Sequence, residues 1–174
     1  EFMLEEGAYP EDVDRALQAF GFAMGPFAVG DMSGLDIAWR MRQAQAALRD
    51  PEARYVGIPD RLCELGRLGR KTGAGYYRYE AGQKGGLPDS AVRELIDAAS
   101  RTKGIERRTI SDQEIQRRVL LTMVNEAALL LAEGVASQAS DIDVVLVNGY
   151  GFPRWEGGPV FWASQRQREQ LDKD

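Results

Sequence analysis

The same series of short motifs occurs twice along the chain. Each copy contains a Glu-Gly pair, an Asp-apolar-Asp triplet, a Gly-Phe pair and a Gly-Pro pair, in that order. The pairs and triplets of the two copies are Glu6-Gly7, Asp12-Val13-Asp14, Gly21-Phe22 and Gly25-Pro26, and then Glu133-Gly134, Asp141-Ile142-Asp143, Gly151-Phe152 and Gly158-Pro159. Gly commonly ends helices and Pro begins them, so each copy predicts a helix, a break and a second helix. A duplicated helical unit explains this order, and the alternative is ordinary Gly and Pro punctuation of a helical protein.

Apolar residues at helical spacing predict an all-α fold with almost no strand. The predicted fold class is two tandem repeats of a helical unit, related by a pseudo-twofold axis. Residues 119–132 are apolar on nearly every side, which predicts a helix that is buried all round. The predicted helices cover residues 10–20, 27–31, 35–48, 59–65, 88–102, 111–134, a segment starting near 140 and a segment starting at 159.

The repeats are expected to meet at a flexible link, Gly82–Gly86. The first repeat then covers residues 4–82 and the second covers residues 87–174. Residues 1–3 are expected to be a cloning remnant followed by a start Met. Residues 4–7 are typical of the last turn of a helix, which predicts that the chain is a piece of a longer protein.

Histidine is absent from the chain, and Cys63 is its one cysteine. The chain therefore has no His general base, no Ser-His or Cys-His pair, no His metal ligand and no internal disulfide. No catalytic residue and no metal site are predicted. A single cysteine is typical of a reducing compartment, so the predicted location is cytoplasmic.

Charge and hydropathy argue against two classes of partner. The chain has 22 basic and 27 acidic residues, a formal net charge of -5 and no basic block, which disfavours nucleic acid and anionic membranes. Its longest apolar stretch has about 14 residues, fewer than the roughly 20 that cross a bilayer. The sequence predicts a soluble protein with no membrane span.

Longer motifs resemble the C-terminal region of 3-hydroxyacyl-CoA dehydrogenases, most closely the multifunctional β-oxidation enzymes with two tandem copies of that helical domain. The resemblance extends from Leu4 to Ala163. The motifs that carry it are Glu5-Glu6-Gly7, Gly21–Phe27, Asp31–Asp36, Gly69–Tyr77, Asn125-Glu126-Ala127, Ser140–Asp143, Asn148–Pro153 and Gly157–Pro159.

This resemblance implies an enzyme that oxidises 3-hydroxyacyl-CoA with NAD. It also implies that a Rossmann domain upstream holds NAD and supplies a catalytic His–Glu pair. This chain has neither a His nor a Gly-x-Gly-x-x-Gly unit, so the fragment alone is expected to be inactive and to bind no cofactor. Its implied role is substrate domain and assembly surface. Its expected partners are the NAD domain of the same polypeptide, acyl-CoA at the domain interface and a second copy of the chain. The alternative is a non-catalytic helical scaffold that binds protein.

Two groups of residues are candidates for substrate binding. Phe22, Met24 and Pro26 are expected to line the path of the acyl chain, because a flexible Met suits a tunnel wall. Core packing at a helix corner is the alternative for them. Lys71 and Thr72 are expected to contact the CoA phosphates, where a cation beside exposed backbone N–H groups suits an anion. A solvated loop that closes the first repeat is the alternative, and the residues favour it.

Two further pairs of residues are candidates for contacts. Arg154 and Trp155 are expected at an interface between domains, because Arg and Trp are common interface anchors. A Trp folded over its own helix corner is the alternative. Asn125 and Glu126 interrupt the predicted buried helix and would need partners there. They are expected to tie the repeat together, and a contact with a site or interface is the alternative.

Overall fold

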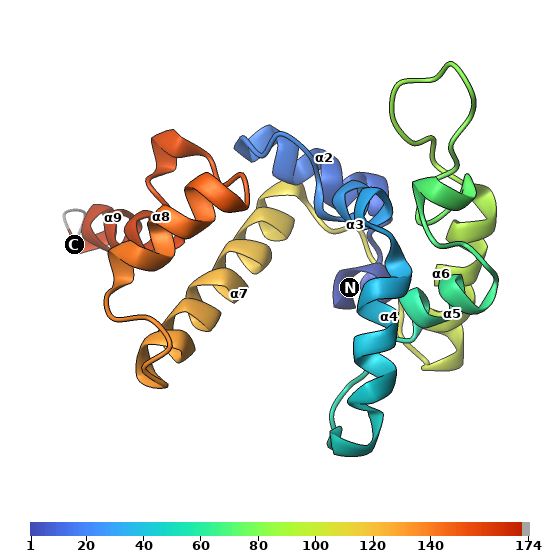
Figure 1. Ribbon diagram of the computed structural model, residues 1–174, viewed down its shortest axis with the longest axis horizontal. Coiled ribbons are helices and arrows are strands. Elements are labelled where there is room, and N and C mark those ends of the chain that lie inside the picture. Colours follow the sequence, from blue (N-terminus) through green and yellow to red (C-terminus); the bar gives the residue numbers. More distant parts are fainter. Residues whose placement is uncertain (172–174) are drawn as a thin grey trace. The chain divides into compact units, whose positions relative to one another are not determined.

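The computed structural model describes the backbone of residues 1–171 and the side chains of residues 1–166. The fold is all-α, as predicted, and the described part of the chain has isolated β-bridges but no β-strand (Figure 1). The helices are α1 (Phe2–Glu6), α2 (Pro10–Phe20), α3 (Pro26–Ser33), α4 (Leu35–Ala44), α5 (Ile58–Glu64), α6 (Ser90–Thr102), α7 (Asp112–Ala132), α8 (Ala139–Gly149) and α9 (Pro159–Leu171), with 3-10 turns η1 (Ala46–Leu48), η2 (Arg70–Thr72) and η3 (Arg154–Glu156).

The chain forms two compact units. Unit 1 contains residues 1–15 and 24–111, and unit 2 contains residues 16–23 and the chain from residue 112 onward. These units do not coincide with the predicted repeats, 4–82 and 87–174. A repeat is defined by where a motif series starts again, whereas a compact unit is defined by which residues pack together. The repeat limits therefore stay a prediction, as does the cloning origin of residues 1–3, although Met3 is buried within α1.

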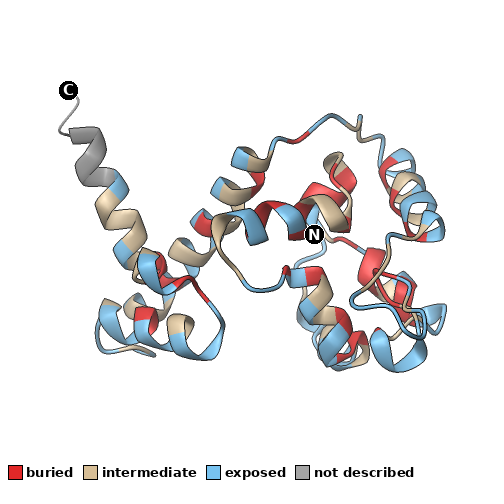
Figure 2. Ribbon diagram, turned by 90° about the horizontal axis from the view of Figure 1, so that it is seen from above, coloured by how far each residue is buried: buried red, intermediate tan, exposed pale blue. Residues whose placement is uncertain are grey.

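Unit 1 is held together by helices from distant parts of its sequence. Helix α1 packs against α6, and α4 packs against α5. Its core contains the fully buried side chains Leu4, Ile58, Leu62, Val92 and Ile96. Helical ribbons carry both buried and exposed residues (Figure 2), and on α6 the buried residues Val92, Ile96 and Ser100 recur every four residues, as expected when one side of a helix faces a core.

Unit 2 is built from α7, α8 and α9, which pack against one another, and from the end of α2. Ile115 and Leu120 of α7 are buried in its core together with Phe152. The ring of Phe20 lies 6.0 Å from that of Phe152 in an edge-on contact. Such aromatic pairs add about 0.5–1.5 kcal/mol beyond their burial.

Helix boundaries follow the sequence signals where those signals are local. Helix α2 begins at Pro10 and stops before Gly21, whose φ of 129° suits glycine. The side chain of Asp89 caps α6 by accepting a hydrogen bond from Ala91 N. The predicted helix over 35–48 ends early, at Ala44, and continues only as the turn η1.

The prediction that α7 is buried on all sides is wrong. Ile115, Leu120 and Ala127 are its buried residues, whereas Leu121 is 42% exposed and Leu129 is 54% exposed. Helices α8 and α9 cover only part of its circumference. Asn125 and Glu126 are exposed as well. Water can therefore solvate them, and their roles in tying the repeat together or in contacting a site or interface stay predictions.

Candidate functional site

The start of α3 is fixed by a carboxylate from α2. Asp14 accepts hydrogen bonds from the backbone N–H groups of Phe27 and Ala28, each at 2.9 Å. First-turn N–H groups have no partner within their own helix, so this side chain satisfies two of them. Gly25 lies against the same carboxylate, and an added Cβ there would sit 2.2 Å from the Asp14 Cβ.

A second carboxylate ties the loop after η2 to α3. Asp31 is fully buried and accepts hydrogen bonds from the backbone N–H groups of Tyr76 and Tyr77, each at 2.9 Å. The hydroxyl of Tyr79 donates to the same group at 3.0 Å. The loop passes so close that a Cβ on Gly75 would lie 2.0 Å from the Asp31 carboxylate.

Tyr77 joins the two carboxylates, because its hydroxyl donates to Asp14 at 2.8 Å while its N–H donates to Asp31. Burial raises the pKa of both carboxyl groups, since their desolvation outweighs the hydrogen bonds they accept. Burial also raises the pKa of Tyr77. Every oxygen of the two carboxylates accepts a hydrogen bond. The network therefore holds α3 and the loop in place rather than offering an acid or base to a substrate.

Exposed apolar side chains lie on the part of unit 1 that this network fixes. We call them the methionine-rich surface, and they are Met24, Val29, Met32, Ile37 and Met41, which are between 40% and 60% exposed. Val29 and Met32 are three residues apart on α3, and Ile37 and Met41 are four apart on α4, so the members of each pair are neighbours on their helix. Helices α3 and α4 contact each other. Exposed apolar side chains on two helices that contact each other are typical of a binding surface, and Met adapts to varied partners.

Sequence reasoning found one member of this surface, Met24, and missed the rest. Ile37 and Met41 lie in the helix predicted over 35–48, but helical spacing alone does not distinguish a core face from an exposed binding face. The sequence signal that could have revealed this surface is the high apolar content of α3 and α4. Two short consecutive helices carry more apolar side chains than one small core can cover.

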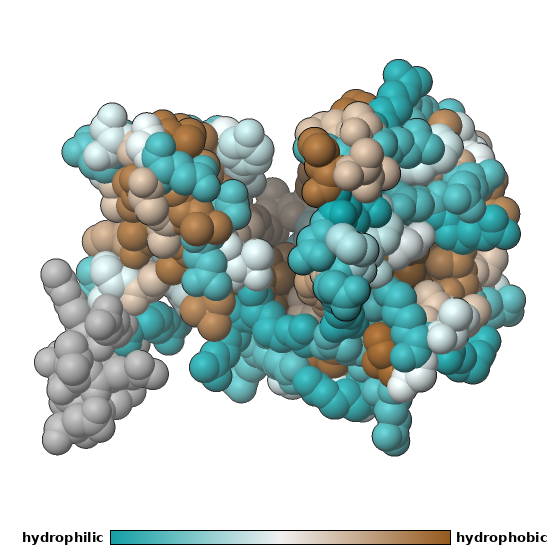
Figure 3. Space-filling model, turned by 90° about the horizontal axis from the view of Figure 1, so that it is seen from below, coloured by the Kyte–Doolittle hydropathy of each residue, from teal (hydrophilic) through white to brown (hydrophobic). Residues whose placement is uncertain are grey.

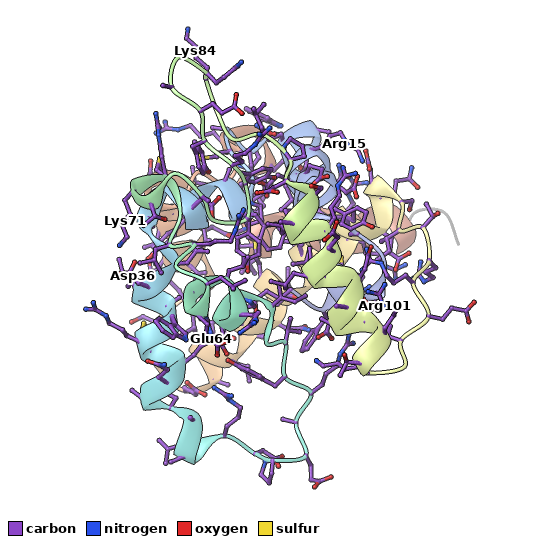
Figure 4. All side chains as sticks on the ribbon, turned by 90° about the vertical axis from the view of Figure 1, so that its right-hand side faces the viewer. Arg15, Asp36, Glu64, Lys71, Lys84 and Arg101 are labelled. Carbon is purple, nitrogen blue, oxygen red and sulfur yellow. The ribbon has the colours of Figure 1, made fainter. Side chains whose placement is uncertain are left out.

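Lys71 and Thr72 both have partners within unit 1. The Thr72 hydroxyl accepts a hydrogen bond from Leu68 N at 2.9 Å and lies within donating distance of two backbone carbonyls of the loop. The Lys71 ammonium is ion-paired with Asp36 of α4, as Figure 4 shows. The hydrogen bond from Lys71 lowers the pKa of that carboxyl group. These contacts suit a loop that closes unit 1, and a role in ligand binding stays a prediction.

The residues predicted to line an acyl path have different surroundings. The Phe22 ring packs in unit 2, with ring centres 5.5 Å from Phe152 and 6.0 Å from Phe20. Met24 and Pro26 are exposed in unit 1. The packing of Phe22 supports the core alternative for that residue, while Met24 belongs to the methionine-rich surface.

Arg154 and Trp155 lie in the 3-10 turn η3 of unit 2. Trp155 is 72% exposed, although its ring leaves no room for a Cβ on Gly21, which would lie 2.4 Å from it. The Arg154 guanidinium donates to the side-chain oxygen of Asn148 at 3.0 Å. The Trp155 ring thus contacts its own unit and also exposes most of its surface to solvent. Both interpretations of the pair stay open, and the interface role stays a prediction.

The described part of the chain has neither a metal-binding group of side chains nor a membrane-spanning helix. No group of three or more Cys, Asp or Glu residues is placed to hold a metal ion there. In the same part, none of the helices combines the length and the apolar character needed to cross a bilayer. Cys63 is buried in α5 as a free thiol.

Residues 2–79 match the family model described as 3-hydroxyacyl-CoA dehydrogenase, C-terminal domain. Over 94% of its length the chain is 46% identical to the peroxisomal bifunctional enzyme of Homo sapiens. Over 87% it is 37% identical to the peroxisomal fatty acid beta-oxidation multifunctional protein of Oryza sativa. The chain spans only 24% and 21% of these relatives, about a quarter of their length.

A solved structure shows the same fold. The dehydrogenase part of multifunctional enzyme 1 from C. elegans matches 87% of this chain and 33% of its own, with a TM-score of 0.68 and 30% sequence identity. The similarity to these proteins extends well past residue 79 and therefore includes unit 2.

Proposed function

Because residues 2–79 match the family model of the 3-hydroxyacyl-CoA dehydrogenase C-terminal domain, we propose that this chain is the substrate-domain and assembly portion of a NAD-dependent enzyme of fatty-acid β-oxidation. Such an enzyme removes a proton from the substrate hydroxyl and passes a hydride from carbon to NAD. With no histidine, this chain is proposed to leave both steps to an upstream NAD domain. The fragment alone is proposed to be inactive and to bind no cofactor.

The methionine-rich surface is the observation that carries this proposal. It supplies an apolar wall on which the NAD domain can close and along which an acyl chain can lie. Met suits acyl chains of varied length, because its unbranched thioether adopts many shapes. The Asp14 and Asp31 network holds α3 behind this wall, so the surface is fixed before a partner arrives.

The tandem repeat is part of the proposal, and the same helix cap in both halves supports it. Asp143 accepts hydrogen bonds from Val160 N at 2.8 Å and from Phe161 N at 3.0 Å, just after Pro159. Asp14 does the same after Pro26. A homodimer is a further proposed assembly, and sedimentation of the purified chain tests it.

The location proposed for the protein is the peroxisome. The human and rice relatives are both named as peroxisomal. The cytoplasmic location was predicted from the single cysteine alone. A cysteine count indicates a reducing compartment but does not say which one. Imaging of the protein with a fluorescent tag in its own cell tests the proposal, and diffuse cytoplasmic signal would contradict it.

The proposed function is tested by supplying the missing domain. The NAD domain of the human relative is mixed with this chain, and NADH formation from 3-hydroxybutyryl-CoA is followed by absorbance. We expect NADH only from the mixture. Turnover by the chain alone would contradict the proposal. Tight binding of the two proteins without NADH formation would favour the scaffold alternative.

Charge on the methionine-rich surface should disrupt this rescued activity. We expect Met32→Asp and Met41→Asp to lower NADH formation by about tenfold or more, because a charge buried at an apolar contact costs roughly 2 kcal/mol or more. Leu129→Asp, at an exposed residue of unit 2, is the matched control and should leave the rate unchanged. Equal losses in all three variants would show that this surface has no special role.

Lys71→Met separates the two interpretations of the loop. Because the ammonium is already paired with Asp36, we expect the KM for 3-hydroxybutyryl-CoA in the rescued reaction to change by no more than about twofold. Lys84→Met, in the link between the predicted repeats, is the control (Figure 4). A tenfold rise in KM for Lys71→Met alone would instead assign this residue to the CoA phosphates.

A further inference from the structure

Unit 2 contains an open cavity of about 640 Å³ between α7 and α9. This volume lies within the range of roughly 300–1,000 Å³ that is usual for small-molecule sites. Phe20, Leu120 and Trp162 supply its apolar walls, from α2, α7 and α9 respectively. All of its lining residues belong to unit 2, so its shape is set within one compact body.

Arginines supply the charge of the cavity. Arg117 and Arg166 line it, and none of its lining residues within residues 1–166 carries a carboxylate. Arg117 is exposed, and within residues 1–166 its guanidinium has no ion-pair partner. The next residue, Arg118, differs because it is paired with Glu114 at 3.5 Å. An exposed cation that lines a cavity with apolar walls, and that has no ion-pair partner among the described side chains, favours an anionic ligand.

The positions along α7 separate the polar and apolar ends of the cavity. Gln113 and Arg117 are four residues apart, and Leu120 follows three residues later on the same side of the helix. On this side of α7, the charged Arg117 therefore lies one turn closer to the N-terminal end of the helix than the apolar Leu120. From α9, Arg166 stands one turn beyond Trp162, with its guanidinium carbon 5.9 Å from the Trp ring centre. Both helices thus present an aromatic or aliphatic side chain beside an arginine.

We propose that this cavity binds a medium-chain fatty carboxylate. The aliphatic chain lies against Phe20, Leu120 and Trp162, and the carboxylate is held by the exposed Arg117. A guanidinium suits a carboxylate because it donates two parallel hydrogen bonds to it. This binding site is separate from the methionine-rich surface and does not depend on the proposed function, because it requires neither NAD nor the NAD domain.

Isothermal titration calorimetry of the 174-residue chain tests the site with three probes. Decanoate has both the chain and the charge, butyrate has the charge without the chain, and decanol has the chain without the charge. We expect decanoate, below its micelle concentration, to bind at least tenfold more tightly than either of the others. No saturable binding of decanoate, or equal binding of decanol, would overturn the proposal.

Variants of the arginine locate the binding. Arg117→Gln should weaken decanoate binding at least fivefold, whereas Arg117→Lys should weaken it less, because the ammonium keeps the charge but not the two parallel hydrogen bonds. Arg101→Gln makes the same chemical change on an exposed part of α6 in unit 1 (Figure 4) and should leave binding unchanged. Far-UV circular dichroism verifies that each variant is folded. Equal affinities of Arg117→Gln and Arg101→Gln for decanoate would overturn the assignment.

Discussion

Replacing Asp31 by Ala is expected to lower the free energy of unfolding by about 3–4 kcal/mol. The change removes the acceptor of two backbone N–H groups, Tyr76 and Tyr77, and of the Tyr79 hydroxyl. Each buried donor left without a partner costs roughly 1–3 kcal/mol, and part of this is recovered as the site relaxes. The loop between η2 and α6 would lose its attachment to α3, so we also expect the methionine-rich surface to lose its fixed shape.

Urea unfolding followed by circular dichroism measures this loss. Asp50→Ala is the control, because Asp50 is exposed and its carboxylate accepts a hydrogen bond from the nearby Glu52 N. Its effect should stay within about 0.5 kcal/mol, as for most surface substitutions. Amide hydrogen exchange gives a second readout, since the amides of Tyr76 and Tyr77 should lose protection in Asp31→Ala. Equal unfolding midpoints for the two variants would show that the network does not hold the loop.

The sequence predicts the parts of this fold whose causes are local. Pro10 begins α2 and Gly21 follows its end, because a missing N–H and a positive φ act on the residue itself. Asp31 carried no such signal. It lies inside a short helix, and its partners are 45 and 46 residues further along the chain. A buried carboxylate that accepts distant backbone N–H groups becomes visible only when the loop is in place.

The same limit applies to exposed apolar faces. Helix α7 has enough Leu and Val to be buried all round, yet Leu121 and Leu129 are exposed because its neighbours cover one side. Val144 and Val145 of α8 are exposed as well, and brown side chains appear on the surface of the α8 and α9 lobe in Figure 3. Composition reports how much apolar surface a chain can cover. It does not report which apolar helix face stays exposed in the folded chain. For this reason the sequence did not reveal the methionine-rich surface.

Gly25→Ala and Gly158→Ala are each expected to destabilise the chain by about 3 kcal/mol or more. In both halves the glycine precedes a helix-starting Pro and lies against the carboxylate that caps the helix. An added Cβ would come within 2.2 Å of Asp14 at Gly25 and within 2.3 Å of Asp143 at Gly158. Neither carboxylate can withdraw without freeing two helix N–H groups, so the clash and the lost cap act together. Gly158 also has a φ of 110°, which disfavours alanine.

Gly57→Ala is the matched control, because nothing lies within 4 Å of a Cβ at this position and its φ is -84°. We expect it to leave the unfolding midpoint unchanged or to raise it slightly, since alanine restricts the unfolded chain. A duplicated helical unit requires both caps to matter, one in each compact unit. If Gly25→Ala is severe while Gly158→Ala matches the control, the two caps are not equivalent. The motif series would then reflect the common use of Gly and Pro at helix ends rather than a duplicated helical unit.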